Sequence, residues 1–303
     1  MKINRTKKIA LAALLGASLA FSPFNYTEGY AAPASLVKLN TAAQTQTGVD
    51  WTKGKDSAVT AKGVGLPKNG STALARVAAV MDAQRNLLGI IKGVSIDSET
   101  IMQDLMVKSD TVRREISGLL KGAQIVSEGE NADGSYFVVM SVPLFGATDS
   151  VASVALPAVQ KTSVVQPIPK ANPQITKVPP KEVRIIKEAT YTGLVVDASG
   201  LGLEPTFSPV IFDTNGRAIY GASNIDPDFA IREGMVGYAK TVETAAVNTR
   251  VTANPLVVKA VSVKGGASPN KVNAVVSVED ADRILFANES SKMLDKYAVI
   301  MVR

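Results

Sequence analysis

The sequence predicts an α+β fold with two domains, each built from helices packed on a largely antiparallel sheet and joined by a proline-rich linker. Three observations support this prediction. Apolar residues recur at three- and four-residue spacing in some segments, as in helices, and alternate with polar ones in others, as in strands. Turn signals such as Asn131-Ala132-Asp133-Gly134 separate neighbouring strands. Prolines concentrate near the middle of the chain.

The composition excludes several kinds of chemistry. The chain has 303 residues, 46% hydrophobic and 20% charged, which is typical of a globular protein of about two domains. It contains no Cys and no His, which excludes disulfides, Cys nucleophiles, His-based acid-base catalysis and the usual zinc, haem and iron-sulfur ligands. Aromatic residues make up only 5%, with a single Trp, so a broad stacking platform for sugars or bases is not expected. Carboxylate, Ser/Lys and Tyr chemistry and Mg²⁺ or Ca²⁺ binding remain open to an enzyme, but no motif for them stands out. We expect no enzyme, no catalytic residue, no cofactor and no metal.

Residues 1–31 have the pattern of a secretory signal peptide. An apolar run at 9–21 follows a cluster of basic residues and precedes small residues suited to cleavage after Ala31, or after Ala34. A membrane anchor is the alternative, but this run is shorter than the about 20 residues needed to span a bilayer. We expect export to the periplasm or the outer-membrane periphery, with no integral membrane segment after cleavage. Lipidation would require a Cys, and the chain has none.

The charge balance gives no sign of nucleic-acid binding. The formal net charge is +6, and removal of the leader would halve it. No run of five like charges is found in the remainder. We expect no nucleic-acid partner, and we expect protein partners in the envelope, including other copies of this chain.

The remaining boundaries follow from composition. A short tail at 32–48 precedes the first domain, 49–146, and the linker at 147–187 leads into the second domain, 188–303. Proline disfavours helix at its own position and at the preceding residue. The linker holds six of the fifteen prolines: Pro157, Pro167, Pro169, Pro173, Pro179 and Pro180. Its valines allow two interpretations, a semi-rigid spacer or an added strand for a neighbour.

The first domain begins with a predicted strand at 57–64, and Ser71 is placed to cap a long helix. Apolar residues in that helix predict one buried stripe: Leu74, Val77, Ala78, Met81, Leu88 and Ile91. A second helix is expected at 111–120, followed by an antiparallel hairpin of strands at 123–128 and 136–144.

The second domain alternates predicted strands and short helices. Strands are expected at 191–197, 210–212, 218–220, 256–263, 273–278 and 297–301, and helices at 228–232, 241–248 and after Ser277.

Several stretches resemble a known family. In the first domain they are 78–88 (AAVMDAQRNLL), 91–94 (IKGV), 122–123 (GA) and 136–144 (YFVVMSVPL). This region is similar to the LPP-twenty family of bacterial outer-membrane lipoproteins, which is related to flagellar outer-ring and basal-disk proteins. The second domain resembles the partner domain of exported members at 191–198, 200–205, 220–221 and 254–259. The resemblance implies an envelope protein that assembles with others, including at a flagellar basal body, and the missing Cys departs from the lipidated pattern.

The candidate interaction residues are Asp82, Gln84 and Arg85, which form a polar break in the first helix. They either contact another subunit in a ring, or Asp82 and Arg85 pair on the helix surface or bond to a neighbouring strand end.

Other patterns have simpler explanations. Gly63-x-Gly65 and Gly200-x-Gly202 lack the Walker lysine and the dinucleotide spacing, so turns or bulges are favoured. Asp226, Asp228 and Glu233 lack the EF-hand spacing and are expected to be solvated loop charges. The acidic residues Glu279, Asp280 and Asp282 are expected to cap a helix.

The sequence thus predicts an exported, non-enzymatic envelope protein that acts by protein-protein assembly. The alternative is a periplasmic binding module for a small ligand or a cell-wall fragment.

Overall fold

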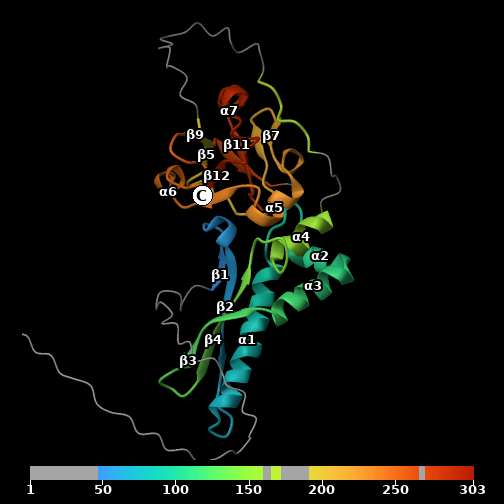
Figure 1. Ribbon diagram of the computed structural model, residues 1–303, viewed down its shortest axis with the longest axis vertical. Coiled ribbons are helices and arrows are strands. Elements are labelled where there is room, and N and C mark those ends of the chain that lie inside the picture. Colours follow the sequence, from blue (N-terminus) through green and yellow to red (C-terminus); the bar gives the residue numbers. More distant parts are fainter. Residues whose placement is uncertain (1–46, 160–164, 172–190, 266–269) are drawn as a thin grey trace, which may run out of the picture. The chain divides into compact units, whose positions relative to one another are not determined.

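The computed structural model describes residues 47–159, 165–171, 191–265 and 270–303 (Figure 1). All of them belong to one compact unit of the chain, Leu39–Arg303. The expected signal peptide at 1–31, most of the tail at 32–48 and much of the linker lie outside the described residues. Within the described ranges, no helix combines the length and apolar character that crossing a membrane requires.

The first domain is built on an antiparallel sheet with the strand order β1-β2-β4-β3. Its strands are β1 (Gly48–Asp50), β2 (Ala58–Gly65), β3 (Gln124–Glu130) and β4 (Tyr136–Pro143). The predicted hairpin is confirmed as β3 and β4, with a register shift between Ile125 and Ser127. The inward residues of β4, including Val138, Met140 and Val142, are almost completely buried. The alternation in this segment therefore identified the core face of the sheet correctly.

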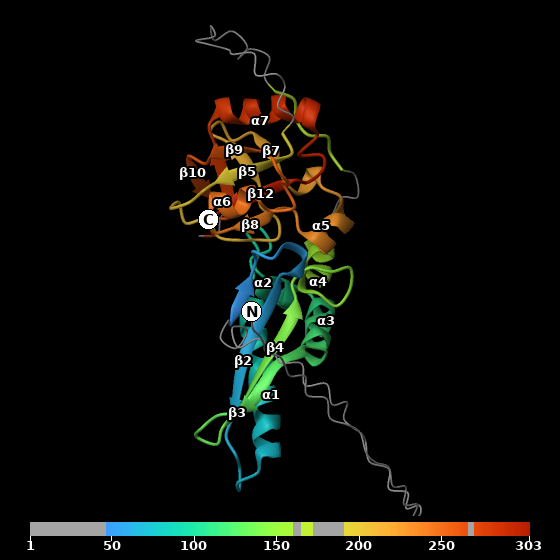
Figure 2. The same cartoon turned by 60° about the vertical axis from the view of Figure 1, so that its left-hand side comes forward.

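Three helices lie between β2 and β3 in the chain, α1 (Thr72–Lys92), α2 (Met102–Lys108) and α3 (Asp110–Lys121), and α1 packs on the sheet. Figures 1 and 2 both show α1 running alongside β2 and β4. The Ser71 hydroxyl caps α1 by accepting a hydrogen bond from the Leu74 N–H, as the sequence predicted. Helix α2 was not predicted from the sequence.

The predicted buried stripe of α1 is wrong in its N-terminal half. The helix packs on the sheet through residues four apart: Ala75, Ala79, Ala83, Leu87 and Ile91. The reason lies in β2, where a Cβ on Gly63 would lie 2.2 Å from the Ala79 carbonyl oxygen. Backbone meets backbone at this contact, so only glycine on the strand and alanine on the helix fit.

The linker prediction is also wrong for residues 151–159, which form α4 (Val151–Val159) and are largely buried. The Ser150 hydroxyl accepts from the Ser153 N–H, and the Ser153 hydroxyl accepts from the Ser150 N–H. This reciprocal cap starts the helix, which forms although Pro157 lies inside it and has no N–H to donate to the preceding turn. Neither an extended spacer nor an added strand describes this segment.

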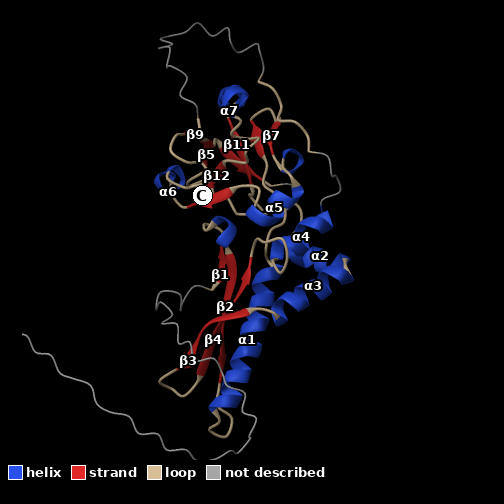
Figure 3. Ribbon diagram, viewed as in Figure 1, coloured by secondary structure: helices blue, strands red, loops and turns tan. Residues whose placement is uncertain are grey.

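The second domain contains two sheets, with the orders β8-β12-β5-β9 and β10-β11-β6-β7. Figure 3 shows its strands and helices by colour. The strands are β5 (Gly193–Asp197), β6 (Ile211–Asp213), β7 (Ala218–Tyr220), β8 (Gly237–Ala239), β9 (Pro255–Lys259), β10 (Ser262–Lys264), β11 (Asn273–Val276) and β12 (Val299–Val302). The helices are α5 (Pro227–Glu233), α6 (Val242–Ala246) and α7 (Val278–Ser291), with the 3-10 turns η2 (Gly54–Asp56) in the first domain and η4 (Ala222–Asn224) in the second.

The α+β class with two domains is confirmed, but the first of these two sheets differs from the expected pairing. All its pairs are parallel, including β12 with β5 and β5 with β9, and in the second sheet β11 also pairs with β6 in parallel. Residues 299–302 are buried on both faces, as is usual for a central parallel strand. The strand predicted at 297–301 is therefore a buried central strand of a parallel sheet, β12, and not a strand of an antiparallel sheet.

An aromatic cluster joins the two domains. Trp51 makes edge contacts with Phe145, Phe207 and Tyr238, at ring-centroid distances of 6.2, 5.2 and 5.8 Å. One hydrophobic core runs through these rings from the first domain into the second. The Phe207 N–H also donates to the Ser95 carbonyl across the junction. The domains are therefore connected by packing as well as by chain.

Candidate functional site

Asp82 and Arg85 lie on α1 beside the edge of β2. The Asp82 carboxylate accepts from the Val64 N–H at 3.0 Å and pairs with the Arg85 guanidinium. One turn later, the Asn86 amide donates to the Lys62 carbonyl at 2.9 Å. These side chains satisfy backbone groups of β2 that no strand of the described residues pairs, and so protect this part of the strand. The structure thus shows the helix-to-strand bonding that was one of the two alternatives for this patch.

Gln84 faces a different neighbour. Its amide donates to the Leu120 carbonyl at 3.1 Å, near the C-terminal end of α3. The polar break in α1 therefore has two parts. Asp82 and Arg85 lie at the edge of β2, and Gln84 forms a hydrogen bond to α3. Of the three predicted residues, only Arg85 is well exposed, at 78% of its side chain.

The residues predicted to be buried on α1 instead form an exposed apolar stripe. We define the α1 stripe as Leu74, Val77 and Met81, which are 51%, 55% and 66% exposed. Their spacing of three and four residues places them on one side of the helix. Further along the same side, Gln84 bonds to α3 and Leu88 is partly covered. The stripe is thus the half of an apolar helix face that α3 does not reach.

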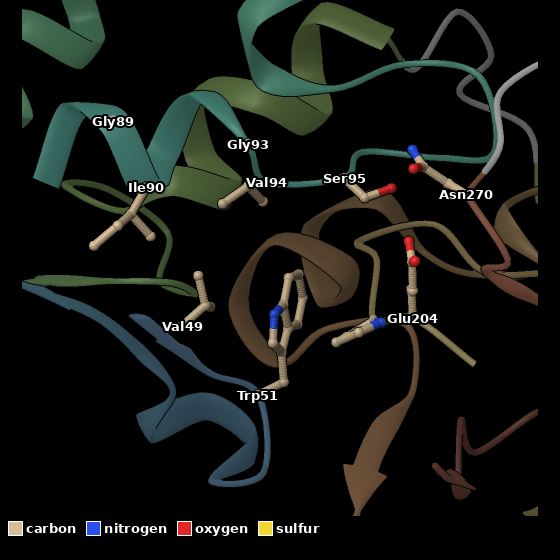
Figure 4. A pocket seen from close by; sticks show the side chains of 10 residues that line it. Val49, Trp51, Gly89, Ile90, Gly93, Val94, Ser95, Glu204 and Asn270 are labelled. Atoms are coloured by element: carbon tan, nitrogen blue, oxygen red, sulfur yellow. The ribbon is translucent and has the colours of Figure 1, made fainter. Parts of the chain in front are cut away.

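A cavity of about 420 Å³ lies beside Trp51 (Figure 4). Figure 4 shows the indole between apolar side chains, Val49, Ile90 and Val94, and polar ones, Ser95, Glu204 and Asn270. The indole is 6% exposed and is fixed by its three aromatic contacts. A rigid ring edged by polar groups is a common feature of small-molecule sites.

The polar groups of this cavity can form hydrogen bonds with a ligand. Within the described ranges, the Trp51 indole N–H has no hydrogen-bond acceptor, which leaves it available as a donor at the cavity wall. Glu204 is exposed and supplies acceptor oxygens. The sequence contains a single Trp, but no local pattern places it at a cavity, because its neighbours come from distant segments.

The glycine pairs have structural roles. Gly200 and Gly202 have φ values of +77° and +74° in the turn after β5, which confirms the prediction of a turn there. Gly63 and Gly65 are neither turn nor bulge, because both lie inside β2 against α1.

Three of the acidic residues that the sequence analysis considered, Asp226, Asp280 and Asp282, have partners of their own. Asp226 caps α5 by accepting from the Phe229 N–H, and Asp280 pairs with Arg283. Asp282 is buried and pairs with Arg217 at 2.8 Å, which in turn bonds to the buried Asp213. Among the described residues, no three carboxylates are grouped so that they could share a metal ion.

The comparisons with known proteins concern the second domain. The family model described as Treponema pallidum Tp0624, second domain, matches residues 193–303. The match runs from the first residue of β5 to the end of the chain, so this domain is similar to that one. None of the curated proteins matches the chain.

Proposed function

We propose that this chain is an exported, non-enzymatic protein of the cell envelope that acts by assembling with other proteins. The observation that carries the proposal is the α1 stripe. Three large apolar side chains on one side of a helix are more than half exposed. Such side chains gathered in one place are typical of a surface that a partner covers.

The partner that fits the stripe best is a second copy of this chain. A two-fold interface brings the same patch of both subunits together. Val77 lies at the middle of the α1 stripe, and Leu74 and Met81 lie at its two ends. Antiparallel packing of two α1 helices would therefore place Leu74 against Met81 of the partner in both directions. The exposed Ala73 and Ala78 leave room for close approach.

Export rests on the sequence pattern at residues 1–31, and the envelope setting rests on that pattern and on the resemblance to the LPP-twenty family. More specifically, we propose that the partner belongs to a flagellar basal body. Fractionation of cells tests the setting: the mature chain should be recovered outside the cytosol without its leader. Recovery of the intact leader in the cytosol would contradict export.

Size-exclusion chromatography with light scattering tests the assembly. The mature chain should shift from monomer to dimer mass as concentration rises, and Val77→Glu should remain a monomer. Val107→Glu is the matched control, because Val107 lies on helix α2 and is 72% exposed. It should dimerise like the unmodified chain. A strict monomer at high concentration, or equal behaviour of both variants, would contradict self-assembly through the stripe.

A second candidate function, a binding module for a small ligand or wall fragment, is favoured by the cavity at Trp51. The available indole N–H and the Glu204 carboxylate suit the hydroxyl and amide groups of amino sugars. Trp51 is the only Trp, so its fluorescence reports this cavity alone. Titration with chitin oligosaccharides should change the emission, and Glu204→Gln should weaken the response more than Glu279→Gln on α7. Unchanged emission would reject this candidate.

A further inference from the structure

We infer that a second cavity, at the junction of η2 with the second domain, binds a small ligand through an oxoanion group, either a carboxylate or a phosphate. It has a volume of about 540 Å³. This inference goes beyond the proposed assembly function. The cavity shares no lining residue with the α1 stripe or with the Trp51 cavity.

The cavity is rich in cations. Four basic side chains line it against two acidic ones: Lys53, Lys55, Arg250 and Lys296 against Asp56 and Glu233. Lys53 is 3.5 Å from Asp50, and the Lys296 ammonium donates to the Ser291 carbonyl. Lys55 has no ion pair among the described residues. The lining therefore carries an excess of positive charge.

Arg250 is the fixed element of this site. Its guanidinium donates to three backbone carbonyls: Tyr297 and Glu233 at 2.9 Å each, and Gly234 at 2.7 Å. The Phe229 ring lies 5.5 Å from the guanidinium carbon, and Tyr297 packs against that ring. A guanidinium has five N–H donors, so two remain after these bonds. The cation is held in one orientation before any ligand arrives.

The charge of Arg250 is not neutralised by an ion pair in the described part of the chain. Burial lowers its pKa, and the nearby Tyr220 and Glu233 only partly oppose this effect. Three carbonyl dipoles do not cancel a full positive charge, and a desolvated cation gains most from an anion.

Polar donors complete the wall. Thr249 and Asn248 line the cavity beside Arg250. The side-chain amide oxygen of Asn248 accepts from the backbone N–H of Arg250, which leaves the NH₂ group of this amide as a donor. Tyr238 contributes no hydroxyl, since that group is bonded to Thr206. Donors thus predominate over acceptors, which is the pattern that an oxoanion needs.

Calorimetric titration of the mature chain with inorganic phosphate, and separately with acetate, tests the inference and distinguishes the two oxoanions. We expect saturable binding of at least one of them, weakened at least tenfold by Lys55→Gln combined with Arg250→Lys. Lys121→Gln, on the exposed end of α3, should leave binding unchanged. If Arg250→Lys fails to fold, Lys55→Gln alone should still weaken binding several-fold.

Titration at raised salt concentration distinguishes a specific anion site from general attraction of anions to surface lysines. Binding at Arg250 should persist at 0.3 M NaCl, because a buried cation is screened less than surface lysines. Absence of saturable binding to both probes, complete loss in salt, or an equal effect of the Lys121 variant would overturn the inference. The dimer test is independent, since Val77→Glu should leave anion binding unchanged.

Discussion

The seam between α1 and β2 and the aromatic cluster at the domain junction are held together by opposite means. At the seam, Gly63 and Gly65 meet Ala75, Ala79 and Ala83 with almost no side chain between the two backbones. At the junction, four large rings fill the space, with centroids 5.2 to 6.2 Å apart. The two contacts should therefore be destabilised by opposite kinds of substitution. The seam is sensitive to added atoms, and the cluster is sensitive to lost ones.

The largest expected effect comes from filling the seam. A Cβ on Gly65 would lie 2.0 Å from the Ala75 carbonyl oxygen and 2.6 Å from the Ala79 nitrogen. Gly65→Val must therefore push the helix off the sheet, and we expect a loss of more than about 5 kcal/mol in the free energy of unfolding. Urea unfolding followed by circular dichroism measures it.

Gly89→Val is the matched control, because it lies on α1 with open space around its Cβ. Its stability should stay within about 0.5 kcal/mol of the unmodified chain. Equal midpoints for both variants would show that the seam is not as tight as described.

Emptying the cluster should have the next largest effect. Trp51→Ala removes a ring that contacts three others, and we expect a loss of about 3–5 kcal/mol. In the unmodified chain the two domains should unfold together in one transition, because they share a hydrophobic core. Phe286→Ala is the control, since this ring on α7 is 67% exposed and its loss should change stability by less than about 0.5 kcal/mol. Two separate transitions in the unmodified chain would contradict a shared core.

Removal of the edge bond beside the seam should have a smaller effect. Asp82→Ala leaves the Val64 N–H without its acceptor, and we expect a loss of about 1–2 kcal/mol. Arg85→Ala removes only the exposed member of the pair and should change stability by less than about 1 kcal/mol. Chemical denaturation of both variants compares them. A larger effect for Arg85 would mean that the ion pair, and not the strand bond, matters at this edge.

Lowering the pH should slightly destabilise the junction and should leave the stability of the seam unchanged. Burial would raise the pKa of Asp50, but bonds from the Thr52 hydroxyl and N–H, with Lys53 nearby, hold this pKa below its usual value. A lowered folded-state pKa gives stability that is present above the unfolded value of about 3.9 and is lost as the pH falls through the folded value. The Thr52 turn adjoins Trp51, whereas the seam residues do not titrate.

Denaturation midpoints between pH 7 and pH 3 test this expectation. Asp50→Asn should lower the midpoint at pH 7 and flatten its decline below about pH 4. A decline as steep as in the unmodified chain would assign the acid sensitivity to other carboxylates.

Local patterns predicted much of the fold because their causes are local. The cap at Ser71, the β3–β4 hairpin and the cap of α7 at Ser277 each depend on residues within a few positions of one another. The patch at Asp82, Gln84 and Arg85 was recognised as a polar break, although its partners were not. The alternation in β4 predicted a buried face, since one face of an antiparallel sheet meets the core.

The sequence by itself determined the α+β class, the absence of Cys and His chemistry, and most element positions. Only the tertiary structure decided which side of α1 is buried, because that depended on two glycines in a strand many residues away. It also decided the parallel pairing of β12, the helix at Val151–Val159, and the meeting of Trp51 with Phe145, Phe207 and Tyr238. These contacts join distant segments, and no short stretch of sequence specifies which distant backbone will come close.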